Sequence, residues 1–155
     1  MPTVQELAVK LNKEGAETLI RNVRAMPEDK TAWQPLENGR TTLSQLQECA
    51  IICGFSIATL TNRAVPADFK EAYGREMAEI DTVEKAAARL EERVEKLAAT
   101  IQGFPASDLD QTIMMPFRPT PVSFAELMFM NYWNVVYHIG QICYIQTLYG
   151  DNEMH

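Results

Sequence analysis

The chain is poor in cysteine and has no segment that looks like an export signal. Its 155 residues include three cysteines, Cys49, Cys53 and Cys143. An odd and sparse set of cysteines does not build the disulfide framework of a small secreted domain. The N-terminus mixes charged and apolar side chains, whereas a signal peptide needs a continuous apolar stretch. We therefore predict a protein of the reducing cytoplasm.

An excess of positive charge is also missing, and we find no run that is long and apolar enough to span a bilayer. Acidic residues outnumber basic ones, 21 to 14, and the formal net charge is −7. Such a chain repels the phosphates of nucleic acids and the anionic surface of a membrane. We expect neither nucleic acid nor a membrane among its partners.

What is present is the composition of an ordinary globular protein. Hydrophobic residues make up 46% of the chain and charged residues 23%, and this length suits one domain over residues 1–155. The sequence has no strand-rich region, no internal repeat and no low-complexity tract. The fold class predicted from these features and from the helical patterns below is all-α.

Four long helices are predicted from their N-terminal capping patterns. In a capping box, a small polar residue and an acid or amide three residues later satisfy each other's backbone donors. Each box found here precedes a run of helical apolar periodicity. The pairs are Thr3 with Glu6, Thr42 with Gln45, Asp81 with Glu84, and Ser123 with Glu126. The expected helices cover residues 3–25, 42–63, 82–102 and 124–149.

The connections between these helices are long and contain most of the prolines. They cover residues 26–41, 64–80 and 104–122, with a short helix expected near 68–73 and an extended piece near 113–117. Loops of this length do not suit a bundle joined by minimal turns. They predict a four-helix bundle with crossover connections.

The last predicted helix, 124–149, carries the most unusual pattern. It has no lysine, arginine or acid between Glu126 and Asp151. A helix this apolar must be covered on most sides, by the other helices or by a second subunit. Its polar residues recur at spacings of three and four, which places them in one row and predicts a buried site: Asn131, Asn134, His138 and Gln141.

Several motifs resemble those of the DinB-like (DinB/YfiT) proteins. Residues 33–46 resemble the entry to the second helix of that family, and residues 104–110 and 121–127 resemble its approach to the last helix. The segment His138-Ile-Gly-Gln-Ile is similar to its most recognisable motif. The order and spacing match over residues 30–150. The resemblance implies a four-helix bundle with crossover loops that commonly forms a homodimer.

The resemblance also implies a site for a divalent metal, which this chain changes. Members often hold the metal with one histidine on the second helix and two histidines four residues apart on the last. His138 matches one of them, but Asn134 stands four residues earlier. The position on the second helix falls at Cys49, or at Glu48 if the register slips by one. Only one of the three histidines is therefore retained.

Two interpretations of this altered site remain. In one, Cys49, His138 and Asn134 hold zinc or nickel. In the other, His138 is a buried histidine with hydrogen-bonded partners and Cys49 is a core residue. We favour the second, because metal sites need at least three protein ligands and an amide is a weak one. Either way, the expected pocket also contains Glu48, Cys53, Asn131 and Gln141.

The functional hypotheses follow from these two interpretations. The first is a DinB-like protein with a degenerate metal site that needs no cofactor and either binds a small molecule or acts through its dimer. The alternative is a transferase or hydrolase that depends on a divalent metal and a thiol ligand and uses Cys49 and His138. Cys49 and Cys53, four apart, are interpreted as packing residues, because about 6 Å between their Cβ atoms exceeds disulfide geometry.

Overall fold

The computed structural model describes residues 1–155, and almost all of its regular structure is helical. The all-α prediction is therefore confirmed. The four long helices are α1 (Val4–Arg24), α3 (Thr42–Asn62), α5 (Val83–Gln102) and α7 (Met130–Leu148). The short elements are α2 (Glu28–Thr31), α4 (Phe69–Glu79), the 3-10 turn η1 (Ala106–Asp108), β1 (Thr112–Ile113), β2 (Val122–Ser123) and α6 (Phe124–Leu127).

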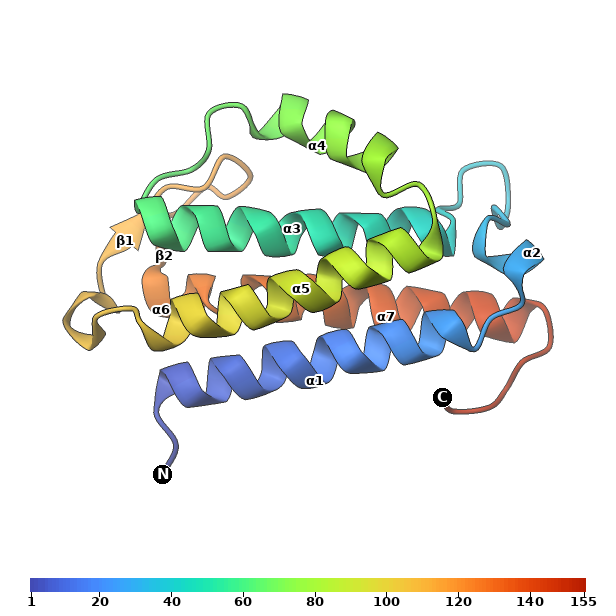
Figure 1. The fold of residues 1–155 in the computed structure, drawn as a ribbon, viewed down its shortest axis with the longest axis horizontal. Helices are drawn as coiled ribbons and strands as arrows, with labels where there is room; N and C mark the ends of the chain where they lie inside the picture. Colours follow the sequence, from blue (N-terminus) through green and yellow to red (C-terminus); the bar gives the residue numbers. More distant parts are fainter.

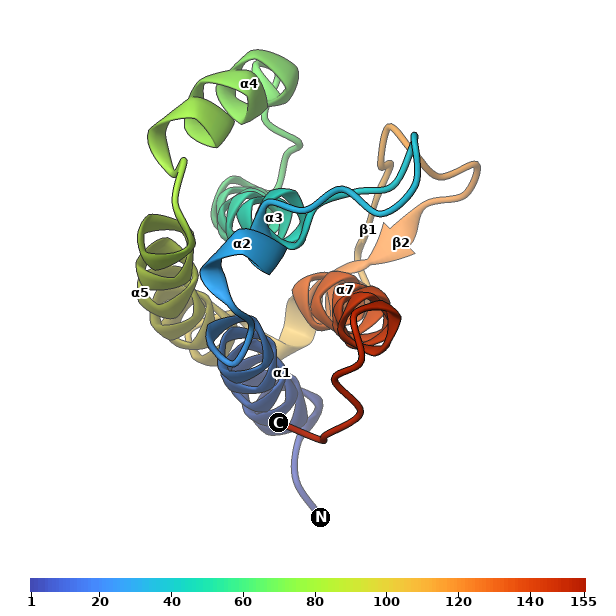
Figure 2. The ribbon, with the colours of Figure 1, turned by 90° about the vertical axis from the view of Figure 1, so that its right-hand side faces the viewer.

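The four long helices pack side by side as a bundle (Figures 1 and 2). Helices α1 and α7 run in one direction, and α3 and α5 run in the other (Figure 1). Because α3 and α5 are parallel, the chain must return along the whole bundle between them, and α4 lies on this return path outside α3. The predicted crossover connection is thus present. The loops over residues 32–41 and 114–121 both extend on the side of α3 and α7 (Figure 2).

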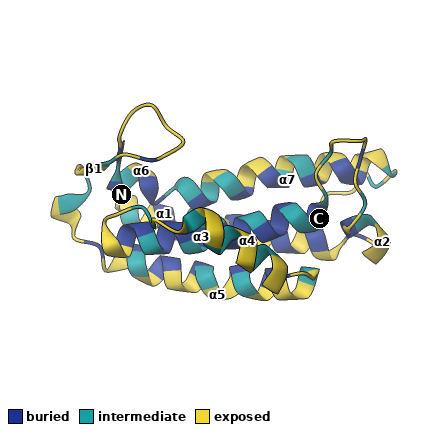
Figure 3. Cartoon of the chain, turned by 90° about the horizontal axis from the view of Figure 1, so that it is seen from above, coloured by how far each residue is buried: buried dark blue, intermediate teal, exposed yellow.

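Leucine and isoleucine side chains from all four long helices fill the core. Leu19, Leu46, Leu90 and Ile142, one from each helix, are completely buried. Each such side chain contributes about 1.5–3 kcal/mol relative to an exposed position. Figure 3 shows the buried positions recurring along the helices while exposed positions alternate with them. The core therefore fixes how α3 and α7 face each other.

Two of the four predicted capping boxes form, and the other two helices begin at different caps. Thr3 with Glu6 and Ser123 with Glu126 make both reciprocal hydrogen bonds. Helix α3 is capped by Thr41, one residue earlier than predicted, and α5 by Thr82, one residue later. In both cases the hydroxyl of the neighbouring threonine accepts a hydrogen bond from the backbone N–H three residues ahead. Two adjacent residues can therefore each serve as the N-cap, and the capping pattern alone does not choose between them.

The helix predicted over 124–149 is interrupted after its first turn. Helix α6 ends at Leu127, and Phe129 N–H bonds to Glu126 O in a tighter, 3-10 type turn before α7 begins. The buried Asn12 of α1 donates to the Met128 carbonyl at 2.9 Å. This hydrogen bond ties α1 to the interruption and sets where α7 starts.

The connections contain more regular structure than the sequence indicated. Helix α4 begins where a short helix was expected but continues to Glu79, and α2 was not predicted. Of the extended piece expected over 113–117, only Ile113 lies in a strand, in which Thr112 pairs with Ser123 and Ile113 with Val122. This hairpin holds the loop 114–121 beside the start of α6.

By length and composition, α3 is long and apolar enough to cross a membrane, contrary to the expectation from the sequence. However, 67% of its most apolar window is buried against the rest of the chain. A core helix of this kind passes the same test, and the apolar surface of α3 is covered by protein. The prediction overlooked it because Gln45, Gln47 and Glu48 interrupt the run.

Candidate functional site

Glu48 is the centre of the polar site between α3 and α7. It is the only charged residue of α3, and its side chain is 21% exposed. One carboxylate oxygen, Oε1, accepts hydrogen bonds from His138 Nε2 and Asn134 Nδ2, each at 3.0 Å. The other, Oε2, accepts from Arg40 Nη1 at 2.6 Å. A single carboxylate thus joins α3, α7 and the loop before α3.

His138 is completely buried and has a partner on each ring nitrogen. Nε2 faces Glu48, and Nδ1 lies 2.9 Å from the amide oxygens of both Gln45 and Gln141. Because an amide can present its oxygen or its nitrogen, these two glutamines can serve either protonation state of Nδ1. The ring is held in place from α3 on one side and from its own helix on the other. We refer to Arg40, Gln45, Glu48, Asn134, His138 and Gln141 as the Glu48 cluster.

The hydrogen bonds of the Glu48 cluster keep its carboxylate charged. The bond from His138 is the largest influence and lowers the pKa of Glu48 to about 2. Burial acts in the opposite direction, but Asn134 and Arg40 add to the lowering. Arg40 is fixed by a second bond, from Nη2 to the Ser44 carbonyl at 3.2 Å. The site therefore contains a paired positive and negative charge at neutral pH.

Tyr73 of α4 is close enough to the cluster to respond to its charges. Burial raises the pKa of the Tyr73 hydroxyl first, and the charge of Glu48 raises it further, while Arg40 opposes both. Helix α4 therefore contributes one polar group beside the Arg40–Glu48 pair.

The register of α3 places Glu48, and not Cys49, against His138. Cys49 is completely buried in the apolar core and forms no hydrogen bond with His138. Successive residues of a helix point about 100° apart, so only one of the two can face α7. Burial, followed by the Glu48 charge, raises the pKa of Cys49 well above its ordinary value. The thiolate that a metal ligand or nucleophile requires is therefore disfavoured here.

Two other residues expected in the pocket lie elsewhere. Cys53 is buried in the core, where burial raises its pKa to about 12. Asn131 donates to Asn12 Oδ1 of α1 at 3.0 Å and does not contact the Glu48 cluster. Helix α7 packs against both α1 and α3, so its inner face meets α1 at Asn131 and α3 at His138. Asn134 and Gln141 do join His138 as the spacing predicted.

The roles of Gln45 and Arg40 in the site were not predicted from the sequence. Gln45 was interpreted only as part of a helix cap, yet it is buried and contacts His138. The available signal was the pair Gln45 and Glu48, which are three residues apart and therefore share one face of the helix. Arg40 precedes the helix, and its pairing with Glu48 depends on the conformation of the loop.

An open groove of about 570 Å³ borders the Glu48 cluster. Arg40, Gln45 and Gln141 belong to its lining, so the cluster can be reached from the surface. The remaining lining comes from the loop before α3 and from the outer face of α7: Pro35, Leu36, Asn38, Gly39, Tyr137, Gly140, Tyr144, Ile145 and Leu148.

The three positions implied for a metal are thus occupied by Glu48, Asn134 and His138. No group of three or more histidine, cysteine, aspartate or glutamate side chains in this structure is arranged to hold a metal ion. The donor set offers two strong ligands and one amide, whose oxygen, Asn134 Oδ1, is buried without a partner. These residues do not fit the three strong ligands of a usual protein metal site.

The fold and the site define the class of protein, a four-helix bundle with a polar site between its second and fourth long helices. The sequence profile described as the DinB superfamily matches residues 11–142. Because this match covers most of the chain, the protein belongs to the DinB superfamily. No relative of curated function matches the sequence significantly.

The solved structures that resemble this one include two of the same enzyme. Both are crystal structures of the mycothiol-dependent maleylpyruvate isomerase, with TM-scores of 0.68 for the isomerase and 0.67 for a histidine-to-alanine mutant. Each is 17% identical in sequence, and the match covers 92% of this chain. The chain spans 63% of the length of the isomerase chains. This likeness shows a shared fold.

Glu48 should make the protein less stable as the pH is lowered through a defined range. Its pKa is about 2 in the folded protein and about 4.5 when unfolded, so its stabilisation is complete above pH 4.5. It is lost as the pH falls from about 4.5 through 2, by about 3 kcal/mol in total. We expect Glu48→Gln to show a shallower loss of unfolding free energy in acid than the wild type, measured by urea denaturation. Equal slopes for Glu48→Gln and the exposed control Glu92→Gln would contradict this assignment.

Proposed function

We propose that this DinB superfamily protein binds a small molecule at the Glu48 cluster without a metal ion. The supporting observation is that both oxygens of Glu48 already have partners, Arg40 on one and His138 with Asn134 on the other. A divalent ion at this place would have to break these hydrogen bonds and share the carboxylate with a guanidinium. We also propose that residues 1–155 act as one cytoplasmic domain.

The groove beside the cluster suggests the chemistry of the ligand. The oxygen of Gln141 contacts His138, while its amide nitrogen makes no hydrogen bond within the chain. Gln141 lines the groove together with Tyr137 and Tyr144, and with its oxygen on His138 the nitrogen is free to donate to a ligand. Because Arg40 and Glu48 neutralise each other, an uncharged compound fits best. We therefore propose a small, flat ligand that carries a hydrogen-bond acceptor such as a carbonyl.

Metal analysis tests the first part of this proposal. For protein expressed without a histidine tag, we expect far less than one zinc or nickel per chain by elemental analysis. We also expect no rise in melting temperature with either ion, because only a ligand that binds the folded state stabilises it. About one ion per chain, lost in His138→Ala and kept in His155→Ala, would contradict a metal-free site.

Binding of an aryl amide tests the second part. We expect benzamide to raise the melting temperature of the wild type in a saturable way. Gln141→Leu removes the donor, so its affinity should fall about three- to tenfold, as for the loss of one hydrogen bond. The matched control is Gln102→Leu on the exposed surface of α5, which should bind like the wild type. Equal affinity of Gln141→Leu and Gln102→Leu would contradict binding in the groove.

One observation favours a second candidate, a metal-dependent enzyme that uses a thiol ligand. The buried Asn134 Oδ1 has no hydrogen-bond partner, and Glu48, Asn134 and His138 stand at the three positions where relatives hold a metal. The structural neighbours are described as mycothiol-dependent isomerases. If the metal analysis finds one ion per chain, thiol-transfer assays on Glu48→Gln and His138→Ala would be the next test of this candidate.

We further propose that the protein is a homodimer joined through the outer face of α7. Tyr137 and Tyr144 are 62% and 65% exposed, and no lysine, arginine or acid lies between them. Two copies that each carry a net charge of −7 meet with least repulsion through a neutral face of this kind. A partner there would also close the groove, since Tyr137 and Tyr144 line it.

A charge placed on this face should separate the two copies. We expect light scattering during size-exclusion chromatography to give a dimer for the wild type and a monomer for Tyr144→Lys, because a C2 interface would bury the new charge twice. Gln102→Lys adds the same charge on α5 and should remain dimeric. A monomeric wild type, or a dimeric Tyr144→Lys, would refute this arrangement.

A further inference from the structure

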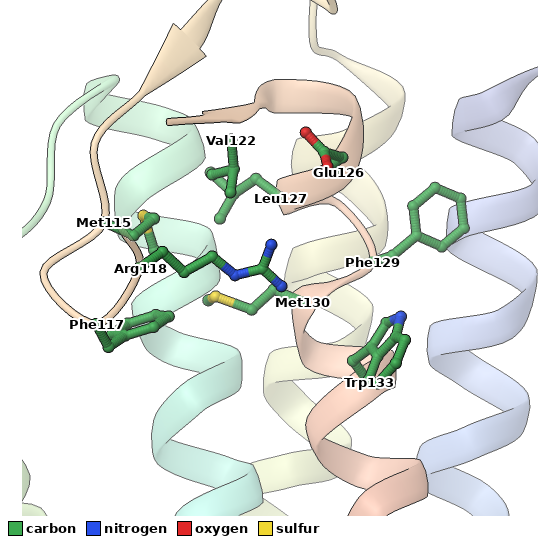
Figure 4. Close-up of a pocket in the computed structure, with 9 residues that line it drawn as sticks. All are labelled: Met115, Phe117, Arg118, Val122, Glu126, Leu127, Phe129, Met130 and Trp133. Atoms are coloured by element: carbon green, nitrogen blue, oxygen red, sulfur yellow. The ribbon is translucent and has the colours of Figure 1, made fainter. Parts of the chain in front are cut away.

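A second pocket lies at the other end of α7 and shares no residue with the Glu48 cluster (Figure 4). Its volume is about 380 Å³, which is within the size range of small-molecule sites. The loop 114–121 forms one wall, and α6 with the first turns of α7 forms the other. Most of the lining is apolar and includes Met115, Phe117, Leu127, Met130 and Trp133.

Arg118 is the only positively charged residue of this pocket, and it forms no ion pair. Its backbone N–H bonds to the Met115 carbonyl at 3.2 Å, which closes a turn of the loop. In Figure 4 the Arg118 guanidinium extends across the middle of the pocket, among the apolar side chains of Leu127 and Met130. The pocket therefore presents an exposed cation without an ion-pair partner beside an apolar wall.

Glu126 is the one acidic residue of the pocket, and its carboxylate already has hydrogen-bond partners. Glu126 Oε2 accepts hydrogen bonds from the Ser123 N–H at 2.8 Å and the Ser123 hydroxyl at 2.9 Å. These bonds cap α6, and they lower the pKa of Glu126, so the carboxylate is charged but committed to the helix end. Figure 4 shows Glu126 at the far edge of the pocket from Phe117. The charge of Arg118 adds a smaller lowering of the Glu126 pKa, but the two side chains form no ion pair.

We propose that this pocket binds a carboxylic acid with an apolar chain or ring. A guanidinium and a carboxylate form paired, parallel hydrogen bonds, which makes arginine a suitable anchor for such a group. The apolar body of the ligand would lie against Met115, Met130 and Trp133, whose side chains it would remove from water. This site is independent of the proposed function at the Glu48 cluster.

Tryptophan fluorescence can follow this binding directly. The chain has two tryptophans, and Trp33→Phe leaves Trp133, in the pocket, as the only one. We expect sodium decanoate to change the fluorescence of this variant in a saturable way. Acetate, which lacks the apolar chain, and decyltrimethylammonium, which reverses the charge, should both bind at least tenfold more weakly.

The role of Arg118 is tested in the same background. Arg118 is exposed, so Arg118→Gln should fold normally, and circular dichroism will check this. We expect it to weaken decanoate binding about tenfold or more, which is the effect of losing a hydrogen bond between charged groups. Arg75→Gln, which removes an exposed charge on α4, should bind decanoate like its parent.

Several results with decanoate, its analogues and the Arg118 variant would overturn the proposal. They are the absence of a saturable response to decanoate, equal affinity of Arg118→Gln and Arg75→Gln, and tighter binding of decyltrimethylammonium than of decanoate. Glu48→Gln separates the two sites. Unchanged decanoate binding in this variant supports a pocket of its own, whereas lost binding would place the acid at the Glu48 cluster and overturn the assignment to Arg118.

Discussion

The hydrogen bonds of the Glu48 carboxylate hold α3, α7 and the loop before α3 in one arrangement. A carboxylate that is four-fifths shielded from water is costly unless its oxygens are bonded, and removing one partner of such a group is more destabilising than the net value of the bond. The positions of Arg40, Asn134 and His138 can be understood from this constraint. Gln45 and Gln141 then satisfy the other nitrogen of the buried imidazole.

The need of the Glu48 carboxylate for partners also explains how side chains at the positions expected for metal ligands can form a hydrogen-bonded site. Three neutral imidazole ligands leave the two positive charges of a divalent ion unbalanced. Here a carboxylate stands on α3 and an amide on α7, so the charges balance without an ion once Arg40 is added. The cluster lies where α3 and α7 meet, and the proposed function uses its hydrogen bonds in place of metal ligation.

Much of the fold could be predicted from the sequence, because apolar periodicity and capping residues are local signals. The four long helices, the long connections and the row of Asn134, His138 and Gln141 all followed from spacing. The register of α3 could not be predicted in this way. Thr41 and Thr42 are equally good caps, and the choice between Glu48 and Cys49 as the inward residue depends on packing against α7.

Other parts of the site depend on which helix lies opposite, and a single helix cannot reveal that. Asn131 shares a face with His138 but meets Asn12 of α1. The interruption before α7 likewise depends on Asn12, which is more than a hundred residues away in the sequence. The sequence shows that α7 is apolar, but it does not show which side chains are buried. The rings of Trp133, Tyr137 and Tyr144 are exposed on the surface.

The state of the His138 ring is the most direct test of a metal-free Glu48 cluster. The chain has two histidines, so a long-range proton–nitrogen NMR spectrum contains only two imidazoles, and His155→Gln assigns them. We expect His138 Nε2 to carry a hydrogen and the signals of the His138 ring to stay unchanged when a chelator is added. A His138 Nε2 without hydrogen, whose signal shifts on chelation and returns with zinc or nickel, would show that a metal ion occupies the site and would contradict the account.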